Sequence, residues 1–200
     1  MKKKISIALA AFAFALLLVV GSVAGTIAYL TSTPGAVTNT FTVGNVTITL
    51  DEAKVTPYGE VDGTDRVTGN EYKLIPSHTY DKDPTVHVAA KSEACWVFVK
   101  VENGISTIEA AETNDTKKIA TQIANKGWTP LNNVDNVFYR AVTAEEATTG
   151  IDLVVFEDFT ISGTADIAAY KDAKIIVTAY AIQADGLTAA ATAWTAGGFH

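Results

Sequence analysis

Few side chains in this sequence have the types and spacing that chemistry requires. The histidines are His78, His87 and His200. His78, Asp81 and His87 could converge on a metal ion if neighbouring strands brought them together, because imidazole and carboxylate groups are common metal ligands. The helical zinc-protease pattern His-Glu-x-x-His does not occur. We therefore expect no metal site, and these three residues are the candidates if one exists.

Motifs of other enzyme classes are also missing. The sequence contains neither Gly-x-Ser-x-Gly nor a phosphate-binding loop. Cys95, the single cysteine, lies in SEACW without a recognisable partner histidine, and it opens an apolar stretch. We expect it to be a small buried hydrophobic residue. The acidic stretches VDGTDR and NNVDN lack the spacing of a calcium loop and are typical of turns. The sequence predicts a protein that is not an enzyme and needs no cofactor.

The charge balance excludes a class of partners. The formal net charge is −7, and the basic cluster of the chain is Lys2, Lys3 and Lys4. Removing these three lowers the basic count from 15 to 12 against 22 acidic residues, which makes the charge −10. Such a chain offers no electrostatic footprint for the phosphates of nucleic acid or for anionic lipid. We expect no nucleic-acid partner.

The N-terminus has the layout of a secretory signal peptide. Three lysines precede the apolar run IALAAFAFALLLVV at 7–20, and the small residues GSVAGTIA follow. Cleavage after Ala28, before Tyr29, and cleavage after Ala24, before Gly25, both fit this chemistry. The alternative is a retained anchor, because residues 5–30 are long enough to span a bilayer. A membrane contact is expected only through this segment when it is uncleaved.

The junction that follows resembles a known family. Its pattern is Gly-Thr-x-Ala-aromatic, a short polar stretch, and then an Asn-x-Phe-x-x-Gly run that leads into an amphipathic strand. The matching residues are Gly25, Thr26, Ala28, Tyr29, Asn39, Phe41, Gly44 and Asn45. This segment is similar to the TasA/camelysin family of exported proteins from Gram-positive bacteria. The resemblance implies a SipW-type signal peptidase as a partner, cleavage after Ala28 and a jelly-roll fold.

Alternation of apolar and polar residues predicts strands through most of the remaining chain. Residues 40–50 alternate with a change of parity at Gly44, where a bulge would restore one buried face. Residues 51–69 are rich in glycine and polar residues and indicate a long loop or an irregular hairpin. CWVFVKVEN at 95–103 is apolar on both faces, which predicts a central strand. The other expected strands are TVHVAA, VFYRAV, LVVFEDFTI and KIIVTAYAIQ.

Two segments have helical composition. Residues 106–126 predict a helix with Ile119, Ala120 and Ile123 on its apolar stripe, interrupted near residues 114–115, and Gly127 is a candidate C-cap. Residues 187–196 predict a short terminal helix.

The predicted organisation is mostly β. We expect a signal peptide at 1–28 that forms an N-terminal signal helix, a flexible arm at 29–39, and a single domain at 40–200. Many short strands separated by turns predict an antiparallel β-sandwich with one or two short helical insertions, and the resemblance implies its jelly-roll-like variant.

These observations lead to a structural hypothesis, namely an exported subunit of an extracellular fibre or biofilm matrix, secreted to the matrix or the cell surface. An arm without a partner in its own fold can add a strand to the next subunit, and such head-to-tail contacts build filaments. The expected contact residues are Tyr29, Leu30, Val37 and Phe41. The alternatives are a camelysin-like secreted metalloprotease and a membrane-anchored surface binding module that retains residues 5–30.

Overall fold

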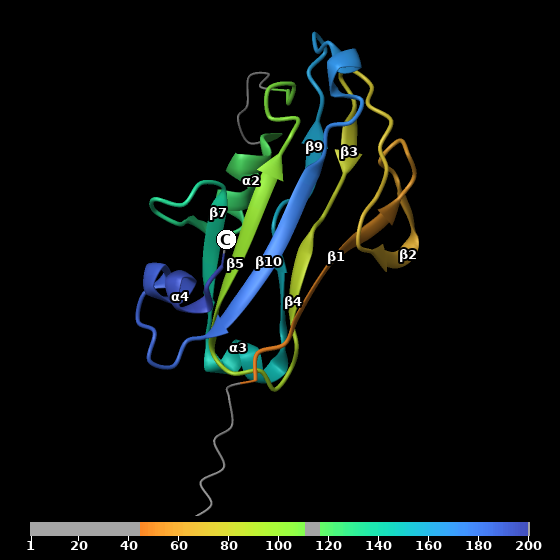
Figure 1. Cartoon of the computed structure of the whole chain (residues 1–200). Helices are drawn as coiled ribbons and strands as arrows, with labels where there is room; N and C mark the ends of the chain where they lie inside the picture. The colour runs from red at the N-terminus through yellow and green to blue at the C-terminus, as the bar shows by residue number, and fades with distance from the viewer. Residues whose placement is uncertain (1–44, 111–116, 200) are drawn as a thin grey trace, which may run out of the picture. The chain divides into compact units, whose positions relative to one another are not determined.

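The computed structural model describes residues 45–110 and 117–199, and its strands pair antiparallel throughout (Figure 1). One four-stranded sheet has the order β2-β1-β4-β8. Its strands are β1 (Ile48–Val55), β2 (Val61–Val67), β4 (Thr85–Val88) and β8 (Ile151–Val154). The chain is therefore mostly β, as the sequence predicts.

The second four-stranded sheet has the order β10-β5-β7-β6. Its strands are β5 (Cys95–Asn103), β6 (Thr129–Pro130), β7 (Val137–Val142) and β10 (Ile175–Gln183). A separate pair joins β3 (Thr79–Asp81) to β9 (Asp158–Thr160).

The helices of the described chain are short. They are α2 (Ile119–Asn125), α3 (Ala144–Thr149), the 3-10 helix η2 (Ile167–Tyr170) and α4 (Ala190–Gly197). Within the described ranges no helix has the length and apolarity needed to cross a membrane. The expected signal peptide at 1–28 and the arm at 29–39 lie outside the described residues.

The strand β5 is the centre of the second sheet, as its sequence predicts. It pairs along its length with β10 and over most of its length with β7. The side chains of Cys95, Val97 and Val99 are fully buried on one face, and Phe98 is fully buried on the other. A strand with apolar side chains on both faces is stable only when other elements cover both faces, as they do here.

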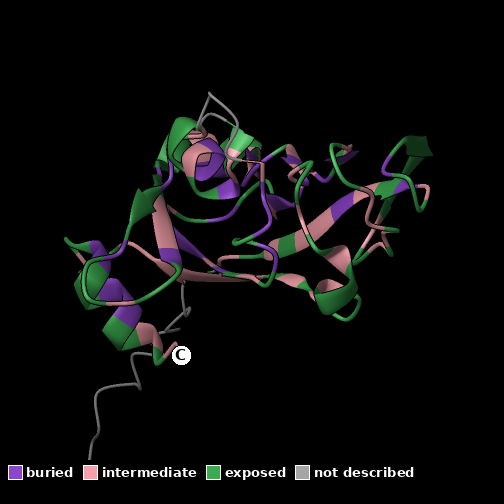
Figure 2. Ribbon diagram, turned by 90° about the horizontal axis from the view of Figure 1, so that it is seen from above, coloured by how far each residue is buried: buried purple, intermediate pink, exposed green. Residues whose placement is uncertain are grey.

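The larger hydrophobic core is shared by both four-stranded sheets. Val86 and Val88 of β4 and Leu153 of β8 belong to the same cluster as the buried valines of β5. A smaller cluster lies on the other face of β5, where Phe98 packs against Trp194 of α4 with ring centroids 5.2 Å apart. In Figure 2 the helix next to the C-terminal label accordingly carries buried residues on one side and exposed residues on the other.

The first strand differs from the sequence prediction. The strand expected at 40–50 runs instead over 48–55, and residues 40–44, with the expected bulge at Gly44, lie outside the described residues. Residues 51–69 form the irregular hairpin of β1 and β2 rather than a loop. The register shifts between Ala53 and Val55. There the side-chain amide of Asn70 accepts from the Val55 N–H at 3.0 Å and donates to the Ala53 carbonyl at 2.9 Å, so it takes the place of a strand neighbour.

The helix expected at 106–126 forms only over 119–125. Residues before it are held by tertiary bonds instead, because the buried Glu109 accepts hydrogen bonds from the Asn103 side chain and from the Ile119 N–H. Ile119 and Ile123 are buried as expected, but Ala120 is exposed. The predicted interruption at 114–115 lies outside the described residues. Gly127 follows the helix with a φ of +83°.

The strand expected as LVVFEDFTI is split into β8 and β9, whereas the terminal helix is confirmed as α4. The helix α3 was not predicted. Its N-terminus has a complete capping box, in which Thr143 and Glu146 satisfy each other's backbone N–H groups.

Two glycines of the β1–β2 hairpin give a stability prediction. Gly59 and Gly63 have φ values of +79° and +82°, and a Cβ on Gly59 would lie 2.6 Å from the Tyr80 Cα, whereas a Cβ on Gly63 would meet nothing within 4 Å. Gly63→Ala should therefore cost about 1 kcal/mol from its backbone conformation alone. Gly59→Ala should cost about 2 kcal/mol more because the tightly packed Tyr80 cannot move away. Urea unfolding of both variants measures the difference, and equal losses would contradict the close packing of Gly59 on Tyr80.

Candidate functional site

The edges of the two large sheets differ in how well they are protected. The edge strand β6 has two residues and includes Pro130, and β8 has four residues. The edge strand β2, VDGTDRV, carries three charged residues. The edge strand β10, IIVTAYAIQ, has nine residues and no charge. Long, uncharged edge strands offer unpaired backbone groups to another strand, whereas short or charged edges discourage pairing. β10 is thus the edge best suited to accept one.

The side chains of β10 follow the two faces of its sheet. Ile175, Val177, Ala179 and Ala181 pack against the main core, while the intervening positions face the other way. All nine residues keep some exposure, in contrast to the fully buried valines of the neighbouring β5. Ile176 is 44% exposed. The strand therefore leaves apolar surface in contact with water.

A second row of partly exposed apolar side chains lies across from this edge. Val46, Ile48 and Leu50 pack against the same core but are only partly buried. The strand β2 pairs with β1 only from Glu52 onward, so Ile48 to Asp51 are bonded on one side, to β4. β1 and β10 approach each other without being neighbours in a sheet. We call the strip between Val46, Ile48 and Leu50 on one side and the core-facing side chains of β10 on the other the open seam.

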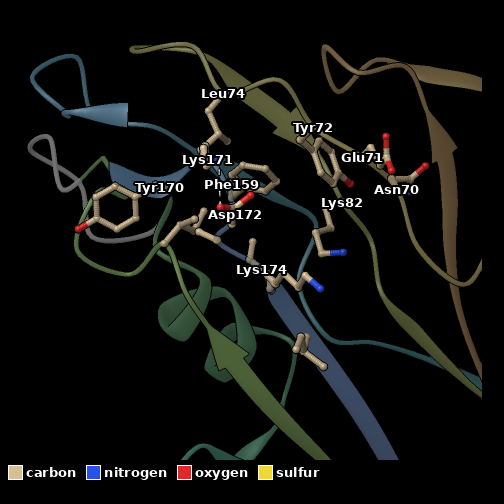
Figure 3. Close-up of a pocket in the computed structure, with 14 residues that line it drawn as sticks. Asn70, Glu71, Tyr72, Leu74, Lys82, Phe159, Tyr170, Lys171, Asp172 and Lys174 are labelled. Carbon is tan, nitrogen blue, oxygen red and sulfur yellow. Dashed lines mark ion pairs between the residues drawn. The ribbon is translucent and has the colours of Figure 1, made fainter. Parts of the chain in front are cut away.

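A cavity of about 630 Å³ lies at the start of β10 (Figure 3). Tyr72 and Phe159 lie together on one wall, with their rings edge to face and 5.2 Å between centroids. Tyr170 lies at the other end of the cavity. Ile175 and Ile176, the first residues of β10, also line it. The cavity is therefore continuous with the edge of β10.

A buried ion pair supports the floor of this cavity. Lys82 and Glu52, 8% and 4% exposed, pair with each other, and the Asn70 side chain donates to the second oxygen of Glu52 at 2.8 Å. The Lys82 ammonium also lies 5.8 Å from the centre of the Tyr72 ring. Burial and the nearby Glu52 carboxylate raise the pKa of Tyr72. A buried charge is tolerable only when it is paired and hydrogen-bonded, and here both conditions are met.

The first sheet carries a network of charges across its four strands. His87 of β4 contacts Asp152 of β8 through Nδ1 at 2.6 Å and Asp51 of β1 through Nε2 at 2.9 Å. Arg66 of β2 pairs with Asp51 and, at 2.9 Å, with Asp83. Burial would lower the pKa of His87, but the two carboxylates outweigh it and raise the pKa. The same contacts, from Arg66 and His87, lower the pKa of Asp51 against the effect of burial.

The candidate metal ligands do not come together. The Nε2 of His78 donates to the Tyr58 carbonyl at 2.7 Å, whereas His87 belongs to the charge network and Asp81 lies in β3. Within residues 45–110 and 117–199, no group of three or more His, Cys, Asp or Glu side chains is placed to hold a metal ion.

Cys95 is the small buried residue that the sequence predicts. Its side chain is fully buried, and burial, with a smaller effect of Glu146, raises the pKa of the thiol to about 11. The predicted cleavage and contact residues lie outside the described residues. They are Ala24, Gly25, Ala28, Tyr29, Leu30, Val37 and Phe41.

Sequence reasoning missed both the open seam and the charge network. His87 and Asp152 face each other across two strands that are 65 positions apart in the chain. A sequence shows such a pair only after the strand order is known. The uncharged sequence IIVTAYAIQ was the available signal, but central strands and unprotected edges share it, so it does not separate the two without the strand order.

Comparisons with known proteins do not extend these observations. No protein-family model, no curated protein and no solved structure matches the chain.

The charge network makes the stability depend on pH. Because the pKa of His87 is raised in the fold, its protonated form contributes stability fully at pH below its unfolded pKa, near 6.5, and that contribution is lost as the pH rises through the folded pKa. We expect the free energy of unfolding to fall by no more than about 1 kcal/mol across this window, since the groups are partly exposed. Urea unfolding at a series of pH values measures it. His87→Gln should remove this dependence and His78→Gln should keep it; a dependence unchanged in His87→Gln would refute the assignment.

Proposed function

We propose that this protein is an exported structural subunit of an extracellular fibre or biofilm matrix, which assembles by adding a strand of one copy to the sheet of the next. The observation that carries the proposal is the unprotected edge of β10 beside the open seam. Apolar side chains on both sides of the seam stay partly exposed, so a strand placed there would bury them.

The occupant that we propose is the segment at 29–43 of a second copy, called here the donor segment. It contains no charged residue, which suits an uncharged edge and an apolar seam. Backbone hydrogen bonds to β10 would supply affinity, and alternate side chains of the donor segment would pack against the partly exposed apolar side chains of the seam. The contact is head-to-tail and does not close on itself, so it continues into a filament.

The proposal includes the processing of the chain and its fold. Cleavage after Ala28 by a SipW-type signal peptidase would make Tyr29 the first residue and free the donor segment. The two four-stranded sheets, which share one core, would be the layers of a jelly-roll-like β-sandwich of the TasA/camelysin kind. The role is structural rather than catalytic, and the protein would act in the matrix or at the cell surface.

A deletion tests the donor segment. Removing residues 29–39 takes away most of the added strand but none of the described domain, so the variant should fold with unchanged circular dichroism and form no filaments. Negative-stain microscopy compares filament formation by the secreted wild-type protein and the deletion variant. Mass spectrometry identifies the N-terminal residue of each. Filaments that persist in the deletion variant would rule the donor segment out.

A matched pair of substitutions tests the acceptor. Val177→Lys places a charge on the seam side of β10, where it would meet the incoming strand, whereas Thr178→Lys places the same charge on the opposite, exposed side. Val177→Lys should raise the concentration needed for assembly at least about tenfold, equivalent to about 1.4 kcal/mol. Thr178→Lys should change it less than about twofold. Equal effects in two folded variants would place the contact elsewhere.

A further inference from the structure

The cavity at the start of β10 has a mixed lining, in which aromatic and aliphatic side chains offer contact surface to an apolar side chain and charged side chains lie beside them. Its volume is about 630 Å³, well above that of one side chain and within the range of binding pockets. Tyr72, Phe159 and Tyr170 contribute rings, and Ile105 and Ile175 contribute aliphatic surface. Figure 3 shows Tyr72 beside Phe159 and Tyr170 apart from them, and the ring of Phe159 is itself buried.

Three of the five charged residues that line the pocket, Lys82, Lys171 and Asp172, are in ion pairs, and Glu71 and Lys174 line it as well. Lys82 is paired with Glu52, which also accepts from Asn70. Lys171 pairs with Asp172 at 3.6 Å (Figure 3). A ligand therefore does not need to supply a charge to satisfy Lys82, the buried ammonium. An aromatic ring would suit the rim better, because lysine ammonium groups are attracted to ring faces and aromatic rings prefer edge-to-face neighbours.

The pocket and the start of the described chain lie at opposite ends of β10 (Figure 1). Ile175 and Ile176 begin the strand at the pocket. At the other end Gln183 pairs with Cys95, and two residues before Cys95 the Glu93 N–H bonds to the Asn45 carbonyl at 3.1 Å. A donor segment attached at Asn45 of one copy can therefore enter a second copy at its pocket when the two copies are arranged end to end.

We infer that the pocket of one copy binds Phe41 of the next, with Val43 beside it; this rests on the proposed function. A segment that enters at the pocket with its C-terminal part runs antiparallel to β10, like every other strand pair in the domain. Phe41, Val43 and Val37 share one parity, and Ile175 shares its face with the other core-facing residues of β10. Pairing Phe41 with Ile175 directs all three side chains to the seam.

This register places both anchor residues against the pocket. With Phe41 opposite Ile175, Val43 falls opposite Ala173, which also lines the pocket. Only residues 42–44 separate Phe41 from Asn45, a reach of about 13 Å in extended chain. Phe41 and Val43 would thus occupy part of the pocket at the junction of two subunits, and this contact would fix the register of the added strand.

Site-directed disulfide formation tests this inference. Two secreted single-site variants, Phe41→Cys and Ile175→Cys, are mixed, assembled and mildly oxidised, and linked dimers are measured on a non-reducing gel. Directly opposite residues of neighbouring strands lie about 5 Å apart at Cβ, so this pair should link at least tenfold more than Phe41→Cys mixed with Gln183→Cys. Cys95 can remain, because it is fully buried and its thiol has a pKa of about 11.

The outcomes separate this inference from the proposed function. Filaments in which the 41–183 pair links as well as the 41–175 pair would overturn the pocket assignment and leave strand addition standing. Absence of filaments from the secreted wild-type protein would overturn both. If the cysteine variants do not assemble, the remaining comparison is Phe41→Ala against Thr40→Ala. The first should raise the concentration for assembly at least tenfold and the second less than twofold; equal effects would overturn the pocket.

Discussion

The pairing of β5 on both sides and its burial on both faces constrain the rest of the structure. The valines on one face of β5 pack against the first sheet, and Phe98 on the other face packs against α4. Both hydrophobic clusters therefore include residues of this strand. β5 is a central strand of its sheet, so the sheet has an edge strand on either side of it. One edge strand is β6, which has two residues, and the other is β10, which is as long as β5. The unprotected edge is thus a consequence of how the core is completed.

The two sheets handle their free edges differently. In the first sheet, Arg66 of β2 holds Asp51 and Asp83, and the charges of this strand discourage pairing with another chain. Nearby, the buried Glu52 links β1 to Lys82 and Asn70, which fixes the hairpin next to the pocket. β10 has no comparable charges. In the described chain, one long edge is thus protected by charges and the other is not, and the proposed association would use the uncharged edge.

The sequence predicts the elements whose own apolar pattern is strong enough to determine how they are buried. β5, β7, β10 and α4 have strong apolar patterns and form where expected. The segment of β2 was predicted only as a long loop or an irregular hairpin, because VDGTDR has no apolar alternation; the structure shows the hairpin, held by pairing and charge. Residues before Ile119 were expected in a helix, but the bonds of Glu109 prevail over local propensity. The helix α3 was not predicted, although Thr143 and Glu146 have the residue types and spacing of a capping box. The seam and the charge network depend on strand order, which one sequence does not show.

The central claim is that β10 gains a strand when the protein assembles. Amide hydrogen exchange, followed by mass spectrometry of monomer and filament, measures this residue by residue. In the monomer, the amides of β10 that face away from β5 should exchange rapidly, and in filaments they should become at least a hundredfold slower, while those of β2 remain fast. Unchanged exchange in β10 together with new protection in β2 would contradict the account and move the contact to the other sheet.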